Sequence, residues 1–339
     1  MQARTIIVAA AVAAVLLAAG AAQADVFGTG SNQFTINFVP ISGSTNPASG
    51  IPAGADFTFT GVANDYRMGT YEITNDQWNK FTASLGVPVT GSPSYAYSNG
   101  PYFTGTNVPT NNVSWYEAAQ FVNWLNTSTG HHVAYKFTGT QGQSDYTLAT
   151  WSTDEADNGT NLYRHKDAKY YLPTENEWVK AAYWNGTSLQ TYATKAGETP
   201  AEGDGTSGTG WNYYNNGYAT NPAGPWNVGS GSQELNGTYD MMGNVWEWME
   251  SPYSSGDYGT ASNREQRGGA YSIGGYGIGY LASSARYDRG NPGNEGSDGG
   301  FRVASEVPEP ATLSLLALGW LALLRRRFGF AHRERGLRR

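Results

Sequence analysis

The feature that most limits how this chain can fold is the segment between Trp184 and Leu235, where apolar residues have no regular spacing. Glycine, asparagine, threonine and proline dominate it, and it greatly exceeds the connections of about 4–6 residues that are common in compact domains. Either it is a functional surface loop, or contacts outside the segment order it. With 44 glycines and 14% aromatic residues in the chain, we predict a loop-rich body held together by large side chains, not a regular bundle or barrel.

Three helix starts are predicted by one local pattern, the capping box. In Thr74–Gln77, Ser114–Glu117 and Thr174–Glu177, a hydroxyl residue stands three positions before a Gln or Glu, and apolar residues then recur at helical spacing. Glycines suited to helix ends follow at Gly86, Gly130 and Gly186. Short strands are expected where apolar residues alternate, at 34–38, 66–68 leading into 71–73, and 300–304.

The first 24 residues have the three parts of a secretory signal peptide. Arg4 supplies the positive start, residues 6–19 form an apolar run, and Ala22-Gln23-Ala24 is a small-x-small cleavage site. A buried N-terminal helix is the alternative, but the run is alanine-rich and lacks a cap. We therefore predict cleavage after Ala24.

The other end of the chain also carries a membrane-related pattern. The prolines of Val307-Pro308-Glu309-Pro310 stop a helix, because each fixes its own φ and disfavours helix in the residue before it. The apolar stretch 311–324 follows and ends at three arginines, 325–327. At about 1.5 Å per residue it reaches about 20 Å of a roughly 30 Å hydrocarbon core, so it is a marginal transmembrane helix. Its arginines are expected to stay cytoplasmic, which leaves the body outside.

The order Pro-Glu-Pro, apolar stretch, arginine cluster resembles the PEP-CTERM sorting signal of bacteria that make exopolysaccharide. The resemblance covers residues 307 to about 327. It implies that a membrane-embedded exosortase recognises and processes the tail, and that the protein reaches the cell envelope, the surface or the extracellular matrix. The predicted organisation is a signal peptide over 1–24, a body over 25–306 and a sorting tail over 307–339.

Charge and cysteine content exclude several functions. Eight of the 21 basic and two of the 28 acidic residues lie in the end segments, which leaves 13 basic and 26 acidic residues in the body. A nucleic-acid partner would require the opposite balance. The chain has no cysteine, which excludes thiol nucleophiles and thiolate metal sites. Its four histidines have no ligand spacing and are predicted to lie at the surface.

The densest motif is Tyr239–Trp248, which ends in two tryptophans that share one face of an extended segment. Gly243 permits a turn that brings Asp240 toward Glu247. Two carboxylates and backbone carbonyls converging on a turn suit a hard cation such as Ca²⁺. On spacing alone, a pair of solvated acids is an equally open interpretation.

Six motifs resemble, in order, those of the formylglycine-generating, sulfatase-modifying factor family. They lie within residues 66–305 and are MGTYEITN (68–75), NVSWYEA (112–118), LPTENEW (172–178), GTYDMMGNVWEW (237–248), RGGAY (267–271) and DGGFRVA (298–304). The resemblance implies an α+β fold of the C-type-lectin-like, formylglycine-generating-enzyme type, with little regular secondary structure and long ordered loops.

The resemblance also implies metal sites. A structural Ca²⁺ is expected at the side chains of Asp240 and Glu247 and the carbonyls of Gly243 and Val245. A second Ca²⁺ is implied at Asn212 and Tyr213, although the downstream Asp that would complete this site is missing.

The same resemblance removes the family's oxidase chemistry. Oxidase members use two cysteines five residues apart, and the corresponding positions here are Ile273 and Ile278. Isoleucine can neither bind copper(I) nor attack a substrate thiol, so formylglycine generation and a copper cofactor are excluded. Members that make sulfur–carbon bonds with iron carry an additional histidine-bearing domain, which this chain lacks.

Three functions remain open. We favour a non-catalytic binding module of the cell envelope, whose partner is an extracellular polysaccharide or another envelope protein. The alternatives are a structural matrix protein and an enzyme that uses other acids, with Asp288, Glu295 and Asp298 near Arg286 as candidates. The oligomeric state is not predicted.

Aromatic residues of the long loop form the candidate ligand surface. Exposed rings there could stack on sugars, whereas burial against the body is the alternative for each. The predicted surface comprises Trp211, Tyr214, Tyr218, Trp226 and Arg286.

Overall fold

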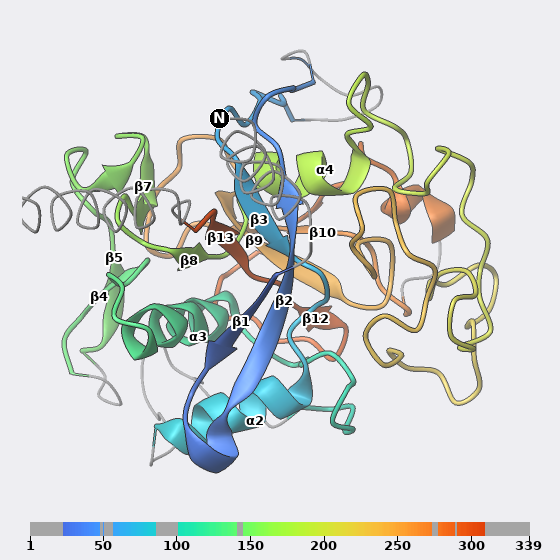
Figure 1. Cartoon of the computed structure of the whole chain (residues 1–339), viewed down its shortest axis with the longest axis horizontal. Helices are drawn as coiled ribbons and strands as arrows, with labels where there is room; N and C mark the ends of the chain where they lie inside the picture. Colours follow the sequence, from blue (N-terminus) through green and yellow to red (C-terminus); the bar gives the residue numbers. More distant parts are fainter. Residues whose placement is uncertain are drawn as a thin grey trace, which may run out of the picture. The chain divides into compact units, whose positions relative to one another are not determined.

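The structure is a computed structural model that describes residues 23–47, 50, 57–85, 101–140, 145–272, 277–288 and 290–308 (Figure 1). The chain divides into a body, residues 1–306, and the segment 307–339. Most of the predicted signal peptide, and the sorting tail beyond Pro308, lie outside the described residues. No helix in the described ranges is both long enough and apolar enough to cross a bilayer.

The three predicted capping boxes begin the three α-helices. In α2 (Asn75–Ser84), α3 (Trp115–Ser128) and α4 (Glu175–Tyr183), the hydroxyl of the N-cap residue accepts from the third helical amide, and the Gln or Glu there bonds back to the cap. Past the ends of α3 and α4, Gly130 and Gly186 have φ of +78° and +90°, as expected of glycines that follow a helix. Gly86 lies outside the described residues.

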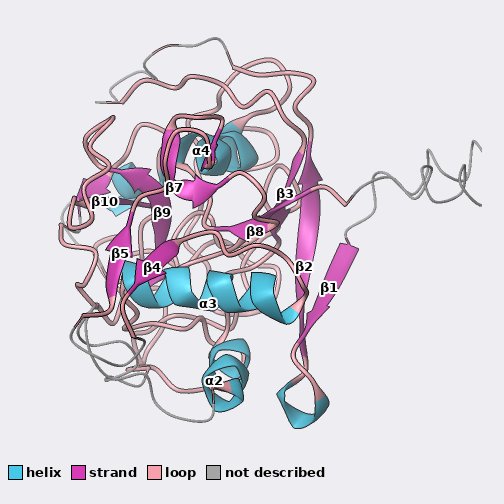
Figure 2. Ribbon diagram, turned by 90° about the vertical axis from the view of Figure 1, so that its left-hand side faces the viewer, coloured by secondary structure: helices cyan, strands magenta, loops and turns pink. Residues whose placement is uncertain are grey.

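A five-stranded antiparallel sheet forms one layer of the body, in the order β1-β2-β3-β13-β8. Its strands are β1 (Gln23–Phe27), β2 (Phe34–Ile41), β3 (Tyr66–Gly69), β13 (Ala304–Glu306) and β8 (Tyr170–Tyr171). Phe34, Ile36 and Phe38 of β2 are buried, which confirms the predicted alternation. α2 contacts β2 and α3 contacts β8, so both helices cover this sheet (Figure 2).

The second sheet has the order β11-β10-β9-β12, and its strands β10, β9 and β12 are buried on both faces. It comprises β11 (Tyr287–Asp288), β10 (Arg264–Arg267), β9 (Trp246–Pro252) and β12 (Gly299–Gly300), with β12 parallel to β9. Two small hairpins complete the strands, β4 (Lys136–Thr138) with β5 (Thr147–Ala149) and β6 (Ala156–Asp157) with β7 (Asn161–His165). Two short 3₁₀ helices are η1 (Gly30–Asn32) and η2 (Gly277–Leu281).

Two strand predictions need correction. Residues 71–73 form no strand, and the expected strand over 300–304 is split between β12 and β13. The chain leaves one sheet after Gly300 and enters the other at Ala304. Between them, the carbonyls of Phe301 and Val303 accept from the amides of Ile73 and Gly69, so this segment pairs with the chain after β3 without continuous strand geometry.

The long segment between α4 and β9 is a loop ordered by contacts with the body, which is one of the two alternatives that its lack of periodicity left open. Apart from isolated bridges at Trp184–Leu189 and Glu202–Trp211, it has no strand, and it has no helix. The rings of Trp211, Tyr213 and Trp226 are buried against the body. Large side chains, rather than regular backbone pairing, therefore hold the loop in place.

Candidate functional site

The turn before β9 has a backbone that strongly restricts its residues. Asp240 and Asn244 both have φ of +62°, in the left-handed region that asparagine and aspartate tolerate better than most residues. Gly243 has φ of +91°, and a Cβ there would lie 2.2 Å from the Asn212 carbonyl oxygen. Glycine is therefore the residue that fits position 243, and the predicted turn is confirmed.

Asn244 joins this turn to the long loop. Its Nδ2 donates to Glu72 Oε2 over 2.9 Å, while its Oδ1 accepts from Trp226 N at 2.7 Å and Asn212 Nδ2 at 3.1 Å. Since Asn212 and Trp226 lie at different points of the loop, a single side chain anchors both to the body.

Glu247 is the centre of a fully buried ion pair. Its Oε1 accepts from Arg302 Nη2 and its Oε2 from Arg302 Nε, each over 2.6 Å. Oε2 also accepts from Trp178 Nε1 at 2.7 Å. Arg302 donates in addition to the carbonyls of Gly69 and Tyr239, both over 2.9 Å. The ion pair thus links β9, α4 and the start of the turn before β9.

Three further carboxyl groups lie near this pair, and with Glu247 we call them the buried acidic cluster: Glu72, Glu234, Asp240 and Glu247. Burial raises the pKa of Glu72 well above its usual value, and the charges of Asp240 and Glu247 act in the same direction. Burial also raises the pKa of Asp240 to about 6 and that of Glu234 to about 8. The cluster carries more carboxyl groups than the single guanidinium of Arg302 can neutralise.

The residues predicted to hold calcium come together around this turn and fit a cation in part. Asp240 Oδ2 accepts from Gly229 N at 2.6 Å, and no described residue donates to the carbonyls of Gly243 or Val245. Glu247 is shared with Arg302. No described group of three or more His, Cys, Asp or Glu side chains could hold a metal, so an ion here would depend on the carbonyls. Calcium at this turn stays a prediction.

The predicted second calcium residues are engaged in holding the loop. The Asn212 carbonyl accepts from Asn244 N at 2.8 Å, and Asn212 Nδ2 donates to the Gly224 carbonyl at 3.1 Å. The Tyr213 hydroxyl donates to the Pro200 carbonyl at 3.0 Å. These bonds give both residues a structural role, and a second ion there also stays a prediction.

Of the two positions that correspond to the cysteines of oxidase members, the described one, Ile278, lies in a 3₁₀ helix that starts beside an aromatic surface. Ile273 is outside the described residues, and Ile278 is half-buried in η2 and packs against the core. The hydroxyl of Ser272, the residue before Ile273, donates to Asp298 Oδ2 over 2.9 Å. A Cβ on Gly277 would lie 3.2 Å from the Tyr214 carbonyl oxygen, so η2 starts next to Tyr214.

We call this surface the aromatic patch: Tyr102, Phe103, Tyr214, Tyr218 and Tyr271. Tyr102 is 71% and Tyr218 52% exposed. Ring centroids are 4.9 Å apart for Tyr102–Phe103, 5.3 Å for Phe103–Tyr271 and 5.2 Å for Tyr214–Tyr218, all edge to face. A Cβ on Gly224 would lie 2.8 Å from the Phe103 ring, so the long loop that carries Tyr214 and Tyr218 packs against the Tyr102–Phe103 segment. Three distant chain segments therefore build one surface.

The predicted ligand surface is only partly one surface. Tyr214 and Tyr218 belong to the aromatic patch, but Trp211 and Trp226 are buried. Arg286 lies elsewhere, where its Nε donates to Glu175 Oε1 at 2.8 Å and its Nη2 lies 3.1 Å from Glu265 Oε2. Treating the five residues as one surface was wrong, because the loop turns its large rings inward and Arg286 is used in ion pairs. Sequence reasoning also missed Tyr102, Phe103 and Tyr271.

One histidine prediction is also wrong. His165 is buried, and its ring stacks on that of exposed His132 with centroids 3.6 Å apart and an interplanar angle of 14°. Trp151 packs edge-on against both rings. The two histidines come from separate segments, so no local spacing reveals the pair.

Comparison with known proteins identifies a family and a relative of this chain. The model of the sulfatase-modifying factor enzyme 1-like domain family matches residues 47–307. A relative named chaperone protein LppX, from Paenibacillus barcinonensis, is 28% identical over 215 residues, and the match covers 56% of this chain and 64% of LppX.

Solved structures share the fold. Treponema denticola variable protein 1 has a TM-score of 0.55 and 21% identity, with 84% of this chain and 99% of that chain covered. CarF has a TM-score of 0.53 and 23% identity, covering 80% and 98%. PvdO from Pseudomonas aeruginosa has a TM-score of 0.53 and 17% identity, covering 84% and 98%. The predicted class, a mixed α+β fold with few helices, is confirmed.

Proposed function

The chain belongs to the sulfatase-modifying factor enzyme 1-like family, and on that premise we propose that it is an exported, non-catalytic binding module that holds polysaccharide on its aromatic patch. The scaffold is lectin-like in this proposal. The signal peptide and sorting tail would place it in the cell envelope or the extracellular matrix, after processing by an exosortase.

The loss of the cysteine pair supports a non-catalytic role. The chain contains no cysteine, and at the described one of the two positions, Ile278 packs against the core. An apolar side chain there can supply neither a nucleophile nor a metal ligand. The surface beside it nevertheless has two exposed rings, Tyr102 and Tyr218, which a binding site can use without any catalytic group.

The aromatic patch is the observation that carries the proposal. Sugar rings have apolar faces that pack on aromatic rings, and tyrosine hydroxyls add hydrogen bonds at the edge. Tyr102 and Tyr218 offer such rings to solvent, and each packs edge to face on a less exposed ring, Tyr102 on Phe103 and Tyr218 on Tyr214. Because tyrosine loses little conformational freedom on binding, a patch built of tyrosines suits a weak, repeated contact with a polymer.

Binding to purified exopolysaccharide tests this function. By titration calorimetry, Tyr102→Ala and Tyr218→Ala should each weaken binding about tenfold, which corresponds to about 1.4 kcal/mol. Tyr146→Ala is the control, since this half-buried tyrosine stacks on Phe137 at the β4–β5 hairpin, outside the aromatic patch. If the unmodified protein shows no saturable binding, or if the three variants behave alike, the proposal is wrong.

A second candidate is an envelope protein as partner, because one relative is named a chaperone. Exposed rings also suit a polypeptide, so the two candidates share the aromatic patch. Prevention of aggregation of an unfolded test protein separates them. Suppression that is lost in Tyr102→Ala, with no binding of polysaccharide, would favour the protein partner.

Calcium belongs to the same proposal as a structural ion at the turn before β9. Asp240 and the carbonyls of Gly243 and Val245 would hold it, and its charge would offset the surplus of the buried acidic cluster. The ion would stiffen the base of the long loop, which carries Tyr214 and Tyr218.

A further inference from the structure

A cavity of about 850 Å³ opens on a part of the body that neither the aromatic patch nor the calcium prediction uses. Its walls come from residues 57–66, the β6–β7 hairpin, the first turn of α4 and the chain from 251 to 258. The volume lies in the range of about 300–1,000 Å³ that is typical of small-ligand sites. Of the residues that the sequence predicted to bind a ligand or a metal, Arg286 alone lines this cavity.

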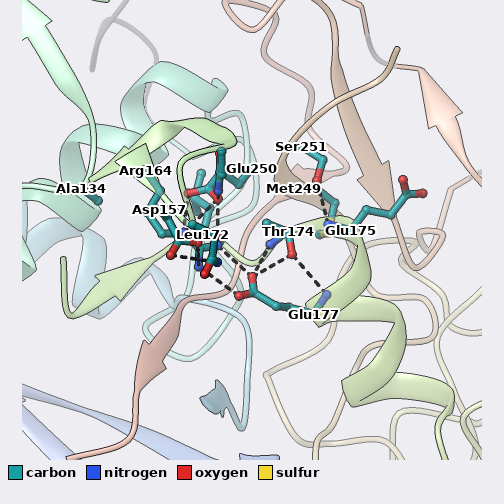
Figure 3. A network of polar contacts seen from close by, with 12 residues as sticks. Ala134, Asp157, Arg164, Leu172, Thr174, Glu175, Glu177, Met249, Glu250 and Ser251 are labelled. Atoms are coloured by element: carbon teal, nitrogen blue, oxygen red, sulfur yellow. Dashed lines mark hydrogen bonds and ion pairs between the residues drawn. The ribbon is translucent and has the colours of Figure 1, made fainter. Parts of the chain in front are cut away.

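Arg164, which lines this polar cavity, is the centre of a network of hydrogen bonds and ion pairs (Figure 3). Its Nη1 and Nη2 donate to the two oxygens of Glu177 at 2.9 and 2.8 Å, and its Nε donates to Glu250 at 3.0 and 3.1 Å. The guanidinium carbon lies 3.5 Å from the centroid of the Tyr171 ring. Glu177 also accepts from the amide and hydroxyl of Thr174, so this network joins β7 to α4 and β9. Arg164 is thereby a structural residue with no donor to spare.

The other cation of the lining is likewise engaged. Arg286 bonds Glu175 and lies within ion-pair distance of Glu265, and its guanidinium rests on the Tyr253 ring at 4.5 Å. Against these two arginines, and against Arg267, which lies outside the lining and also pairs with Glu175, the lining holds five carboxylates: Asp65, Asp157, Glu175, Glu177 and Glu306. The cavity therefore carries a surplus of negative charge and favours a cationic ligand.

The other lining residues indicate which kind of cation the cavity suits. No three described acidic or histidine side chains are arranged to hold a metal ion, so the negative charge is spread over the walls. The lining also contains Asn158, Asn161 and Asn176, several hydroxyl residues, and the half-buried Tyr253 and Tyr258. Amides and hydroxyls bond ligand hydroxyl groups, and tyrosine rings pack on the faces of sugar rings.

We propose that the polar cavity binds an amino sugar, a hexosamine unit of a polysaccharide whose amino group is free and protonated. The ammonium group would sit among the surplus carboxylates near Asp157, whose side chain is 25% exposed and whose Oδ2 is 3.5 Å from Arg164 Nη1. The ring hydroxyls would bond the surrounding amides. This site is separate from the aromatic patch and does not depend on polysaccharide binding there.

The test compares fully deacetylated and fully acetylated glucosamine tetramers by titration calorimetry at mildly acidic pH. The deacetylated tetramer should bind at least tenfold more tightly, and its affinity should fall with added salt. Asp157→Asn should weaken it about three- to fivefold, the effect of losing one partly exposed charge pair. Asp154→Asn makes the same change in net charge on the exposed loop before β6, outside the lining, and should have no effect.

The outcomes separate this inference from the proposed function. Tyr102→Ala is expected to weaken exopolysaccharide binding at the aromatic patch and to leave binding of the deacetylated tetramer unchanged. Equal affinity for the two tetramers, an equal effect of Asp154→Asn, or equally tight binding of tetralysine would each overturn the amino-sugar site. Thermal melts of Asp157→Asn check its folding, and Tyr258→Ala, which leaves the arginine network intact, gives a second variant with an expected loss of affinity.

Discussion

At the scale of single residues, the Glu247–Arg302 pair shows how strongly this interior depends on matched charge. Both partners are fully buried, and the carboxylate makes two bonds to the guanidinium and one to Trp178. A buried pair of this kind adds little net stability compared with an apolar replacement, yet breaking it leaves a charge without its partner.

Glu247→Gln should therefore lower the free energy of unfolding by about 3–5 kcal/mol. Chemical denaturation, monitored by tryptophan fluorescence, measures the loss. Asp76→Asn is the matched control, because the Asp76–Lys80 pair is partly exposed at the surface of α2 and should contribute less than about 0.5 kcal/mol. Similar losses of unfolding free energy in the two variants would show that the buried Glu247 pair contributes no more to stability than a surface pair.

The stacked histidines predict a pH dependence of stability. Burial lowers the pKa of His165, and the neighbouring His132 acts in the same direction, while Asp167 and Glu155 oppose the shift. The folded state therefore binds fewer protons than the unfolded state, whose histidine titrates near 6.5. This contribution to stability is complete above about pH 6.5 and is lost as the pH falls through the lower folded value.

His165→Asn should flatten the fall in melting temperature below that pH, because the titrating ring is gone. His131→Asn controls for the other histidine whose pKa burial lowers, and its effect should be smaller since that side chain lies outside the stacked pair. An unchanged pH profile in His165→Asn would exclude the pair as the source.

At the scale of secondary-structure elements, helix starts were predictable and most strand partners were not. A capping box needs only four adjacent residues, so Ser114 and Glu117 identify the start of α3 without knowledge of the rest of the fold. The strands near the C-terminus pair with residues far away in sequence. Alternation over 300–304 could not reveal that the chain changes sheets there, because the partner, not the pattern, decides where a short strand ends.

The capping boxes can be tested one helix at a time. Ser114→Ala removes the hydroxyl that accepts from Glu117 N and should cost about 1 kcal/mol. Ser128→Ala, near the other end of α3, removes only a bond to the Leu125 carbonyl and is the control. Hydrogen exchange of the first turn of α3 should increase in the first variant alone. No change in exchange would mean that tertiary packing, not the cap, holds the start of the helix.

At the scale of the whole molecule, the sequence located the turn before β9 but not the surfaces that surround it. Residues 237–248 form one continuous motif, so their turn, glycine and acids could be recognised together. The aromatic patch and the polar cavity each combine segments more than a hundred residues apart, such as Phe103 with Tyr271 and Asn64 with Tyr258. The residue pattern within one segment does not indicate which distant segment packs against it. The glycine-rich loops that join the segments do not indicate it either.

Calcium would connect these levels, because one ion at Asp240 would act on the buried acidic cluster, the turn and the long loop together. Added Ca²⁺ should raise the melting temperature of the metal-free protein, since an ion that binds only the folded state stabilises it by mass action. EDTA should reverse the shift, and Mg²⁺ should be much less effective because it dehydrates reluctantly. Asp240→Asn should remove most of the calcium-dependent shift, whereas Asp204→Asn, on the exposed part of the same loop, should keep it.

Equal melting temperatures with Ca²⁺ and EDTA would mean that Arg302 and protonated carboxyl groups alone balance the charge of the buried acidic cluster. Such a protein should then lose stability as the pH rises from about 4.5 toward 8, because the pKa of Glu234 is raised to about 8 and the folded state holds the proton over that range.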